Sequence, residues 1–310
     1  MPQELSTHTS IVVLNYNGTQ NTIMCVNSLL QLNTQNTRIN IIIVDNLSQD
    51  EEVKNLSEFY NSTKLTNDNI TLILNDNNAG FAGGMNIGVK HGITNYDSDF
   101  YWLINNDLTV DKNSLNSLIN FYNQNTDINV GIIGSKIMNF SDNLENNTIQ
   151  SVGAELLKNT GNLRTVDVTE VNTIKDQKLM NQRLFSVPGC AFFITKELIN
   201  KIGLLEDKYF LYFEEFDYSL RAIQAGFYTL SCFESILYHK SGASTGEGNR
   251  ITFYYMTRSR IAFYKKFLPF NLLTVLPFQI YQVCLKPLIK LKFQILSWTS
   301  KGIIDGLLIK

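Results

Sequence analysis

The sequence predicts an α/β fold in which a mostly parallel central sheet is flanked by helices, followed by an amphipathic helical tail at the C-terminus. Short apolar runs alternate with helix-period segments of about ten residues through residues 1–140, which is typical of parallel strands buried on both faces. The chain has 310 residues, of which 44% are hydrophobic. This is enough for one large domain or two small ones with a real core.

Five apolar runs define the strands of the first half. The expected strands are Ser10–Leu14, Ile39–Val44, Ile70–Leu74, Phe100–Ile104 and Val130–Gly134. The expected helices between them are Gln20–Gln31, a segment starting near Asp50, Ala82–His91 and Ser114–Tyr122. The first helix carries its apolar residues on one face, and the second begins with three acids, which suit a helix N-terminus.

The second half is less regular. Residues 141–183 are rich in Asn and polar, and we expect a variable loop or short hairpin region there. The elements expected after it are a strand at Leu184–Thr195, a helix at Glu214–Ala225, a strand at Phe227–Phe233, a glycine and serine loop at 240–248, and a helix at Asn249–Phe267. The body is thus expected at 1–265, with halves at about 1–140 and 184–265, and the tail at 266–310.

Charge is distributed unevenly although the total is only −2 and the pI is about 6.0. Residues 250–310 hold ten Lys or Arg and one acid, Asp305, so this part carries +9 and the rest about −11. The near-neutral total argues against a nucleic-acid binder that works by bulk charge. The basic, apolar tail favours contact with an anionic membrane surface. The alternative is a basic helix pair packed on the body.

The tail contains nineteen uncharged residues at 267–285, the lower limit for a membrane-spanning helix. Prolines and amides interrupt this stretch, and Lys286, Lys290 and Lys292 follow it. An amphipathic segment lying in the membrane interface therefore fits better than a span. The N-terminal segment has no apolar signal region. We expect a cytoplasmic body bound peripherally to the cytoplasmic face of the membrane.

Polar residues follow four of the predicted strands. The dinucleotide, P-loop and nucleophile-elbow glycine motifs are missing from the sequence, which leaves little support for a dehydrogenase, a P-loop NTPase or a serine hydrolase. Ligands of parallel sheets bind beyond the carboxyl ends of the strands. The site is therefore predicted at the polar segments Asn15-Tyr16-Asn17, Asp45, Asn75–Asn78 and Asn105-Asn106-Asp107.

Three features in and beside these segments can carry chemistry. Asp107, at a strand end, suits Mg²⁺ or Mn²⁺, although a simple Asx turn would use the same residues. The glycine-rich loop at 78–86 opens a helix and suits a diphosphate, or else a tight turn with close packing. Glu214 and Glu215 start a helix behind an aromatic run, where a glutamate can act as a general base or simply cap the helix. Asp217 and Arg221 are spaced for an ion pair.

In this order, seven segments resemble the family 2 glycosyltransferases of the GT-A fold, which is Rossmann-like. The nearest group is the rhamnosyltransferase-like enzymes of bacterial surface-polysaccharide and cell-wall biosynthesis. The resemblance covers roughly residues 10–265. The segments are Ser10–Gly18, Val44–Ser48, Asn78–Asn86, Leu103–Thr109, Pro188–Ile194, Phe210–Arg221 and His239–Thr245.

The resemblance implies an inverting, metal-dependent glycosyltransferase. The expected donor is dTDP-L-rhamnose, and the acceptor is a hydroxyl of a lipid-linked or polysaccharide glycan at the inner leaflet. It implies Glu215 as the catalytic base, with Glu214 as second choice, and Mn²⁺ or Mg²⁺ on Asp107 and His239. The implied nucleotide-sugar residues are Asn15, Tyr16, Asn17, Asp45 (at the base), Asn78, Gly80, Phe81, Gly83, Gly84, Asn105 and Asn106.

Two departures from the family pattern affect these assignments. The metal triplet is Asn-Asn-Asp, which offers one carboxylate, and the acidic pair is Glu-Glu rather than Glu-Asp. Other donors of the same family remain open, namely UDP-galactofuranose, UDP-GlcNAc and UDP-galactose. A sugar nucleotidyltransferase and a non-catalytic binding module are the remaining alternatives. The sequence does not decide the acceptor, the linkage or the oligomeric state.

Overall fold

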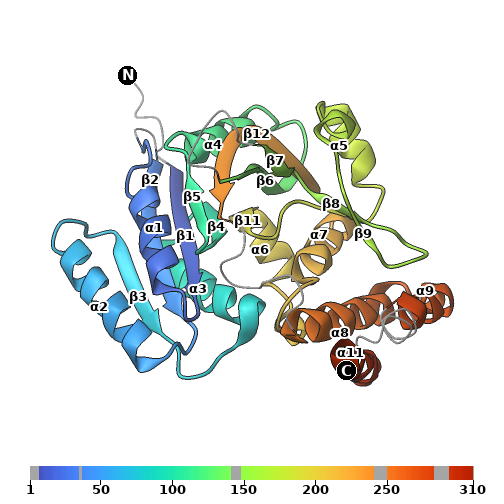
Figure 1. The fold of residues 1–310 in the computed structure, drawn as a ribbon. Helices are drawn as coiled ribbons and strands as arrows, with labels where there is room; N and C mark the ends of the chain where they lie inside the picture. Colours follow the sequence, from blue (N-terminus) through green and yellow to red (C-terminus); the bar gives the residue numbers. More distant parts are fainter. Residues whose placement is uncertain (1–6, 35–36, 141–147, 241–249, 283–292, 310) are drawn as a thin grey trace.

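The computed structural model describes residues 7–34, 37–140, 148–240, 250–282 and 293–309. Within them, a mixed sheet of nine strands has helices on both faces, and further helices follow at the C-terminal end (Figure 1). The strand order is β3-β2-β1-β4-β11-β6-β12-β5, with β7 paired to β6. The predicted α/β class with flanking helices and a helical C-terminal part is confirmed.

The element bounds are as follows. The strands of the large sheet are β1 (Thr7–Asn15), β2 (Thr37–Asp45), β3 (Ile70–Leu74), β4 (Phe100–Asn105), β5 (Leu108–Val110), β6 (Val130–Asn139), β7 (Ile149–Ser151), β11 (Ala191–Thr195) and β12 (Tyr228–His239). The main helices are α1 (Thr19–Leu29), α2 (Asp50–Lys64), α3 (Gly80–Tyr96), α4 (Ser114–Asn123), α5 (Ile174–Met180), α6 (Lys196–Ile202), α7 (Glu214–Gln224), α8 (Arg250–Phe267), α9 (Leu272–Ile280) and α11 (Phe293–Leu308).

The first four long strands, β1 to β4, form the parallel half of the sheet. β1 pairs in parallel with β2 and β4, and β2 pairs in parallel with β3. The register places Asn15 opposite Asp45 and Leu14 opposite Asn105. The polar strand ends predicted to share one rim therefore do so.

The other half differs from the predicted, mostly parallel arrangement. β11 runs antiparallel to both of its neighbours, β4 and β6. Between β6 and β11 the chain passes through β7, the small second sheet and α5. It then re-enters the large sheet from the edge at which β6 ends, so β11 runs in the reverse direction to β6. β5, which has only three residues, pairs antiparallel with the end of β12. This short strand was not predicted, because its apolar pattern is too brief to be periodic.

Part of the region at 148–183 forms a small second sheet with the strand that follows it, rather than a plain loop. The strands β8 (Ala154–Leu156), β9 (Leu163–Thr165) and β10 (Phe185–Ser186) pair antiparallel in the order β10-β8-β9. The helix α5 lies between β9 and β10 in the chain. The hairpin expectation is confirmed for β8 and β9, whereas residues 141–147 lie outside the described part.

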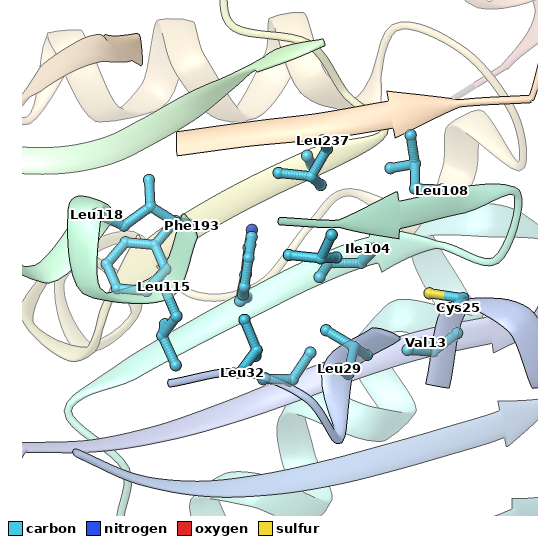
Figure 2. Packing of buried hydrophobic residues seen from close by; sticks show 14 of the residues in the cluster. Val13, Cys25, Leu29, Leu32, Ile104, Leu108, Leu115, Leu118, Phe193 and Leu237 are labelled. Carbon is cyan, nitrogen blue, oxygen red and sulfur yellow. The ribbon is translucent and has the colours of Figure 1, made fainter. Parts of the chain in front are cut away.

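Two apolar cores cover the two faces of the large sheet. Odd-numbered positions of β1, such as Ile11 and Val13, pack with α1, α2 and α4. The intervening Val12 packs with α3, α6 and α7 on the other face. Figure 2 shows the first core, in which Leu29 from α1, Leu115 from α4 and Phe193 from β11 converge between the sheet and its helices. This alternation fixes the register of the sheet.

The helices α8, α9 and α11 lie together at one end of the molecule, remote from α2 (Figure 1). A third apolar cluster joins α7 and the preceding aromatic loop to α8 and α9, through residues such as Phe213, Phe263 and Val275. The expected boundary at 265 falls inside α8. Among the described residues, none of the helices combines the length and apolarity that crossing a membrane requires. Residues 283–285 of the uncharged stretch lie outside the described part.

Candidate active site

The end of β1 is the centre of a buried hydrogen-bond network. Asn15 is fully buried, and its Nδ2 donates to Asp45 Oδ2 at 2.7 Å. Its Oδ1 accepts from Thr22 Oγ1 at 2.7 Å and from Asn106 Nδ2 at 3.3 Å. Asp45 also accepts from the backbone amide and the hydroxyl of Ser48. The network ties the ends of β1, β2 and β4 together.

Asp45 is buried inside this network, with 1% of its surface exposed. Both of its carboxylate oxygens accept hydrogen bonds from the protein. The groups next to it are more accessible: Tyr16 is 53% exposed, and Asn17 adopts a left-handed backbone with φ of 51°. The Oδ1 of Asn17 accepts from the amide of Gln49 at 2.8 Å, which joins the β1 and β2 loops. An exposed aromatic ring on a braced loop can stack on a planar base.

Asn46, which the sequence analysis did not single out, holds the glycine-rich loop. Its Nδ2 donates to Asn78 Oδ1 and to the carbonyl oxygen of Gly80, both at 3.0 Å. Its Oδ1 accepts from the amide of Ala79 at 3.1 Å. Asn46 is 2% exposed. In the sequence, its position directly after Asp45, the last residue of β2, could have indicated that it belongs to the site.

The glycines of this loop serve close packing. Gly80 has φ of +71°, and a Cβ there would lie 2.4 Å from the carbonyl oxygen of Phe210. A Cβ on Gly84 would lie 2.4 Å from Leu14, and one on Gly83 would lie 2.8 Å from the Cβ of Ala79. The glycines therefore let α3 approach β1 and the aromatic loop at 207–213.

Two backbone amides of the glycine-rich loop, which was expected to suit a diphosphate or a tight turn, are engaged by the protein. The amide of Gly80 donates to Asn78 Oδ1 at 3.0 Å, and that of Phe81 donates to the carbonyl oxygen of Phe210 at 2.6 Å. The packing alternative thus accounts for both groups. The loop still presents the start of α3, whose dipole favours an anion.

Asp107 and His239 lie side by side. Leu108 pairs with His239 in the antiparallel ladder between β5 and β12, which brings the preceding Asp107 to the same place. The Oδ2 of Asp107 is 3.3 Å from Nε2 of His239. The other ring nitrogen, Nδ1, contacts Oε1 of Gln150 at 2.9 Å. Gln150, on β7, thus orients the imidazole so that Nε2 faces the carboxylate.

This pair fits a divalent cation as two of its ligands. Neighbouring ligands of an octahedral ion with bonds of about 2.1 Å lie about 3 Å apart, close to the observed separation. A carboxylate oxygen and an imidazole nitrogen are suitable ligands for Mn²⁺. Among the described residues, no third Asp, Glu, His or Cys completes a cluster with them. A pocket lined by Asn106, Tyr238 and Lys240, among others, opens beside Asp107.

The two glutamates begin α7, after a strained turn. Phe213, the residue before the helix, has a left-handed φ of 72°. Phe210 and Tyr212 also have positive φ angles, of 65° and 66°. Glu215 packs on Gly189, where an added Cβ would lie 3.2 Å from the Cβ of Glu215. A turn with three left-handed non-glycine residues costs conformational energy, which is a feature of functional sites.

Both glutamates carry a buried oxygen, Oε2, without a hydrogen-bond partner among the described residues. Burial raises the pKa of Glu215 to about 7. Burial, and then the charge of Glu215, raises the pKa of Glu214 well above its usual range. Of the two, Glu214 is the more buried, at 6% exposed, whereas Glu215 is partly exposed. A partly exposed carboxylate with a pKa near neutrality suits proton transfer.

Cys190 connects the glutamates to the Asp107 side of the site. Burial first, and then the charges of Asp107 and Glu215, raise the pKa of its thiol to about 12. Its carbonyl oxygen accepts from the amide of Asn105 at 2.9 Å. Asn105 Oδ1 is buried without a hydrogen-bond partner among the described residues. Both carboxylates therefore lie within electrostatic range of one residue at the start of β11.

The predicted ion pair of α7 is confirmed. Nε of Arg221 donates to Asp217 Oδ1 at 2.6 Å. Asp217 also receives Lys266 Nζ at 2.6 Å and the hydroxyl of Tyr209 at 3.0 Å. This fully buried carboxylate anchors α7 to α8. The segment at 241–249, which includes most of the predicted glycine and serine loop, lies outside the described residues.

Known proteins resemble this chain in sequence and in fold. The family model described as "Glycosyl transferase family 2" matches residues 10–203. The low-salt glycan biosynthesis hexosyltransferase Agl10 of Haloferax volcanii is 24% identical over 197 residues, 58% of this chain. The chain spans 60% of the length of that relative.

Solved structures share the fold at low sequence identity. GalNAc-T7 with UDP, GalNAc and Mn²⁺ matches at a TM-score of 0.62 with 18% identity, over 84% of this chain and 50% of that one. The mannosyltransferase PcManGT of Pyrobaculum calidifontis, with GDP-Man and Mn²⁺, matches at 0.58 with 11% identity, over 97% and 75%. S. aureus TarS 1-349 with UDP-GlcNAc matches at 0.52 with 15% identity, over 82% and 66%.

Proposed function

The chain belongs to glycosyl transferase family 2, and from that premise we propose that it transfers a hexose from a nucleotide diphosphate sugar to an acceptor hydroxyl with inversion. The chain is a glycosyltransferase. We therefore set aside the two other functions considered from the sequence, a sugar nucleotidyltransferase and a non-catalytic binding module. The observation that carries the proposed mechanism is Glu215. It is a partly exposed carboxylate with a pKa of about 7, and it packs on Gly189. The next residue, Cys190, accepts a backbone hydrogen bond from Asn105 at the end of β4.

In the proposed reaction, Glu215 takes the proton of the acceptor hydroxyl as its oxygen attacks the anomeric carbon. The new glycosidic C–O bond forms as the bond from that carbon to the diphosphate oxygen breaks, and the nucleoside diphosphate leaves from the opposite face. One in-line displacement inverts the configuration. A positioned general base contributes on the order of 10²–10⁴-fold.

The leaving diphosphate carries developing negative charge. We propose that Asp107 and His239 hold a divalent ion, Mn²⁺ or Mg²⁺, because their atoms lie at ligand spacing. When bound, such an ion neutralises charge on phosphate oxygens. The GalNAc-T7 and PcManGT structures both contain Mn²⁺, which supports this assignment. Gln150 keeps Nε2 of the imidazole directed at Asp107, where the two residues would hold the ion.

The donor pocket is proposed at the end of β1 and β2. The exposed ring of Tyr16 offers a stacking surface, and the buried network of Asn15, Asp45 and Asn106 keeps its floor rigid. We keep dTDP-L-rhamnose as the first donor to test, because of the motif resemblance. The acceptor proposed from the same resemblance is a lipid-linked or polysaccharide glycan.

A donor panel tests the proposal. Thermal stabilisation by dTDP-L-rhamnose, UDP-galactofuranose, UDP-GlcNAc, UDP-galactose and GDP-mannose is measured with Mn²⁺ and with EDTA, followed by release of the nucleoside diphosphate. We expect one donor to stabilise the protein and to be turned over only with the metal. In the Asp107→Asn variant, Mn²⁺ should no longer increase the thermal stabilisation by the donor or its turnover. Equal stabilisation and turnover of that donor in EDTA would contradict the metal assignment.

A further inference from the structure

The helix α9 exposes large apolar side chains and buries a polar one. Phe270, just before the helix, is 85% exposed, and Leu273 and Ile280 are 79% and 37% exposed. Thr274 is exposed beside them, and Val275 is buried in the third apolar cluster. The fully buried Gln279 of α9 is polar and donates to the carbonyl oxygen of Thr160 at 2.8 Å. In water, the hydrophobic effect favours the opposite arrangement. The outer face of α9 therefore suits an apolar surrounding.

The helix α11 repeats this pattern. Ile304, Leu307 and Leu308 are 56%, 39% and 71% exposed, while Thr299 is fully buried. Leu307 and Leu308 follow Ile304 by three and four residues, so these three side chains form an apolar stripe on one side of the helix. Trp298, 36% exposed, lies six residues before Ile304, with Lys301 midway between them.

The inner face of α11 fixes this orientation. A Cβ on Gly302 would lie 2.7 Å from the carbonyl oxygen of Tyr254, and one on Gly306 would lie 2.6 Å from that of Arg258. The backbone of α11 thus lies directly against α8, and Tyr254 adds a hydrogen bond from its hydroxyl to Asp305 at 2.6 Å. Turning the apolar stripe inward would break both glycine contacts.

Lysines border the exposed apolar residues. Lys265 Nζ donates to the carbonyl oxygens of Leu307 and Ile309, at 2.8 and 2.9 Å, so that a cation lies at the end of α11. Lys301, 63% exposed at its side chain, lies over the ring of Tyr254 on the same helix pair. Residues 250–310 carry ten basic residues against one acid. Apolar side chains bordered by cations match the interface of a bilayer with anionic headgroups.

We propose that the apolar residues Phe270, Leu273, Ile280, Trp298, Ile304, Leu307 and Leu308, here called the tail face, insert into the headgroup region of an anionic membrane. The inner leaflet expected from the sequence is such a surface. Charge complementarity favours a membrane over a second copy of the chain, because two copies would bring two strongly basic tails together.

The test uses the full chain and sedimentation with vesicles. Vesicles of phosphatidylcholine alone are compared with vesicles of phosphatidylcholine and phosphatidylglycerol in equal parts. We expect binding only to the second kind, weakened by high salt. The double variant Phe270→Glu, Leu273→Glu should reduce the partition coefficient at least about tenfold, because each side chain loses its apolar burial.

The matched control is Leu65→Glu. Leu65 is 86% exposed and follows α2 at the other end of the molecule. This control should bind vesicles as the unaltered chain does. Equal binding of the double variant, or no binding by the unaltered chain, would overturn the proposal. A dimer in light scattering that the double variant abolishes would assign the tail face to a second copy instead. Donor hydrolysis should be unchanged in all three proteins, so a failed vesicle test leaves the proposed transferase activity standing.

Discussion

The two sides of the candidate site differ in how fully their buried oxygens are hydrogen-bonded. On the donor side, Asn15 and Asp45 are almost completely buried, and each of their oxygens accepts hydrogen bonds from the protein. On the acid side, Glu214 and Glu215 each keep a buried oxygen without a partner among the described residues. The first arrangement stabilises the conformation of the strand ends, whereas the second leaves the negative charge of an ionised glutamate poorly compensated.

The difference indicates where the chemistry takes place. A hydrogen-bond network whose amide, hydroxyl and carboxylate groups all have partners changes little during a reaction, and it suits the task proposed for it, which is to hold a donor. Carboxylates that burial has made reluctant to ionise bind protons at near-neutral pH. We infer that proton transfer takes place at the start of α7 and that the donor is positioned at the ends of β1 and β2.

The largest expected effect follows from removing the base. Glu215→Gln should lower kcat on the order of 10²–10⁴-fold while the donor still binds, because only the proton acceptor is lost. In the unaltered enzyme, kcat/KM should fall below pH 7, since the carboxylate with a pKa of about 7 becomes protonated. Turnover and donor affinity, measured by nucleoside diphosphate release and calorimetry, check both statements.

The matched control for this change is Glu214→Gln. It leaves the proposed base in place. Burial, and not the charge of Glu214, raises the pKa of Glu215, so activity should be lost at about the same pH as in the unaltered enzyme. If Glu214→Gln abolished turnover while Glu215→Gln did not, the roles of the two glutamates would have to be exchanged.

A smaller effect should follow from displacing the base without removing it. Gly189→Ala places a methyl group 3.2 Å from the Cβ of Glu215. Because a shift of about 1 Å can cost up to about 10²-fold in rate, we expect a lower kcat with little change in donor affinity. Circular dichroism should show an intact fold. An unchanged kcat would mean that Glu215 can move aside without loss.

The sequence was sufficient for the parallel half of the fold and for the rim. The strands that became β1 to β4 were found because their apolar runs are long and their polar ends fall in register. The acidic start of α7 and the Asp217–Arg221 pair also depend on local spacing. Local signals of this kind can be read from one chain.

Features that depend on distant pairing could not be read in this way. The antiparallel β11 and the short β5 are set by where the chain re-enters the sheet, which no local pattern encodes. Gln150 lies 89 residues from its partner His239, and the approach of Gly189 to Glu215 is equally non-local. For the same reason, the sequence favoured a diphosphate at the glycine loop, whereas the carbonyl oxygen of the distant Phe210 accepts from the amide of Phe81 in this loop.

Breaking the donor-side network should affect stability more than chemistry. Asn15→Ala removes a buried side chain that bonds to Asp45, Thr22 and Asn106. Leaving such groups without a partner costs about 1–3 kcal/mol each, so the free energy of unfolding should fall by at least this amount. KM for the donor should rise with a smaller change in kcat. Urea titration and steady-state kinetics measure the two effects, and a large loss of kcat with normal stability would contradict the division between the two sides.

The smallest effect concerns the pH dependence of stability. Glu215 has a pKa of about 7 in the folded chain and a usual value of 4.5, so between these values the folded state binds more protons than the unfolded state. Stability from this group is therefore fully present at low pH, and is lost as the pH rises through about 4.5 to 7. The double variant Glu214→Gln, Glu215→Gln cannot ionise there, so it should lose this downward slope and melt at a higher temperature than the unaltered chain at pH 8. Asn15→Ala, which leaves both glutamates in place, should keep the slope at a lower overall melting temperature. If the double variant kept the slope, other groups would cause it and the acid side would be better compensated than its buried oxygens indicate.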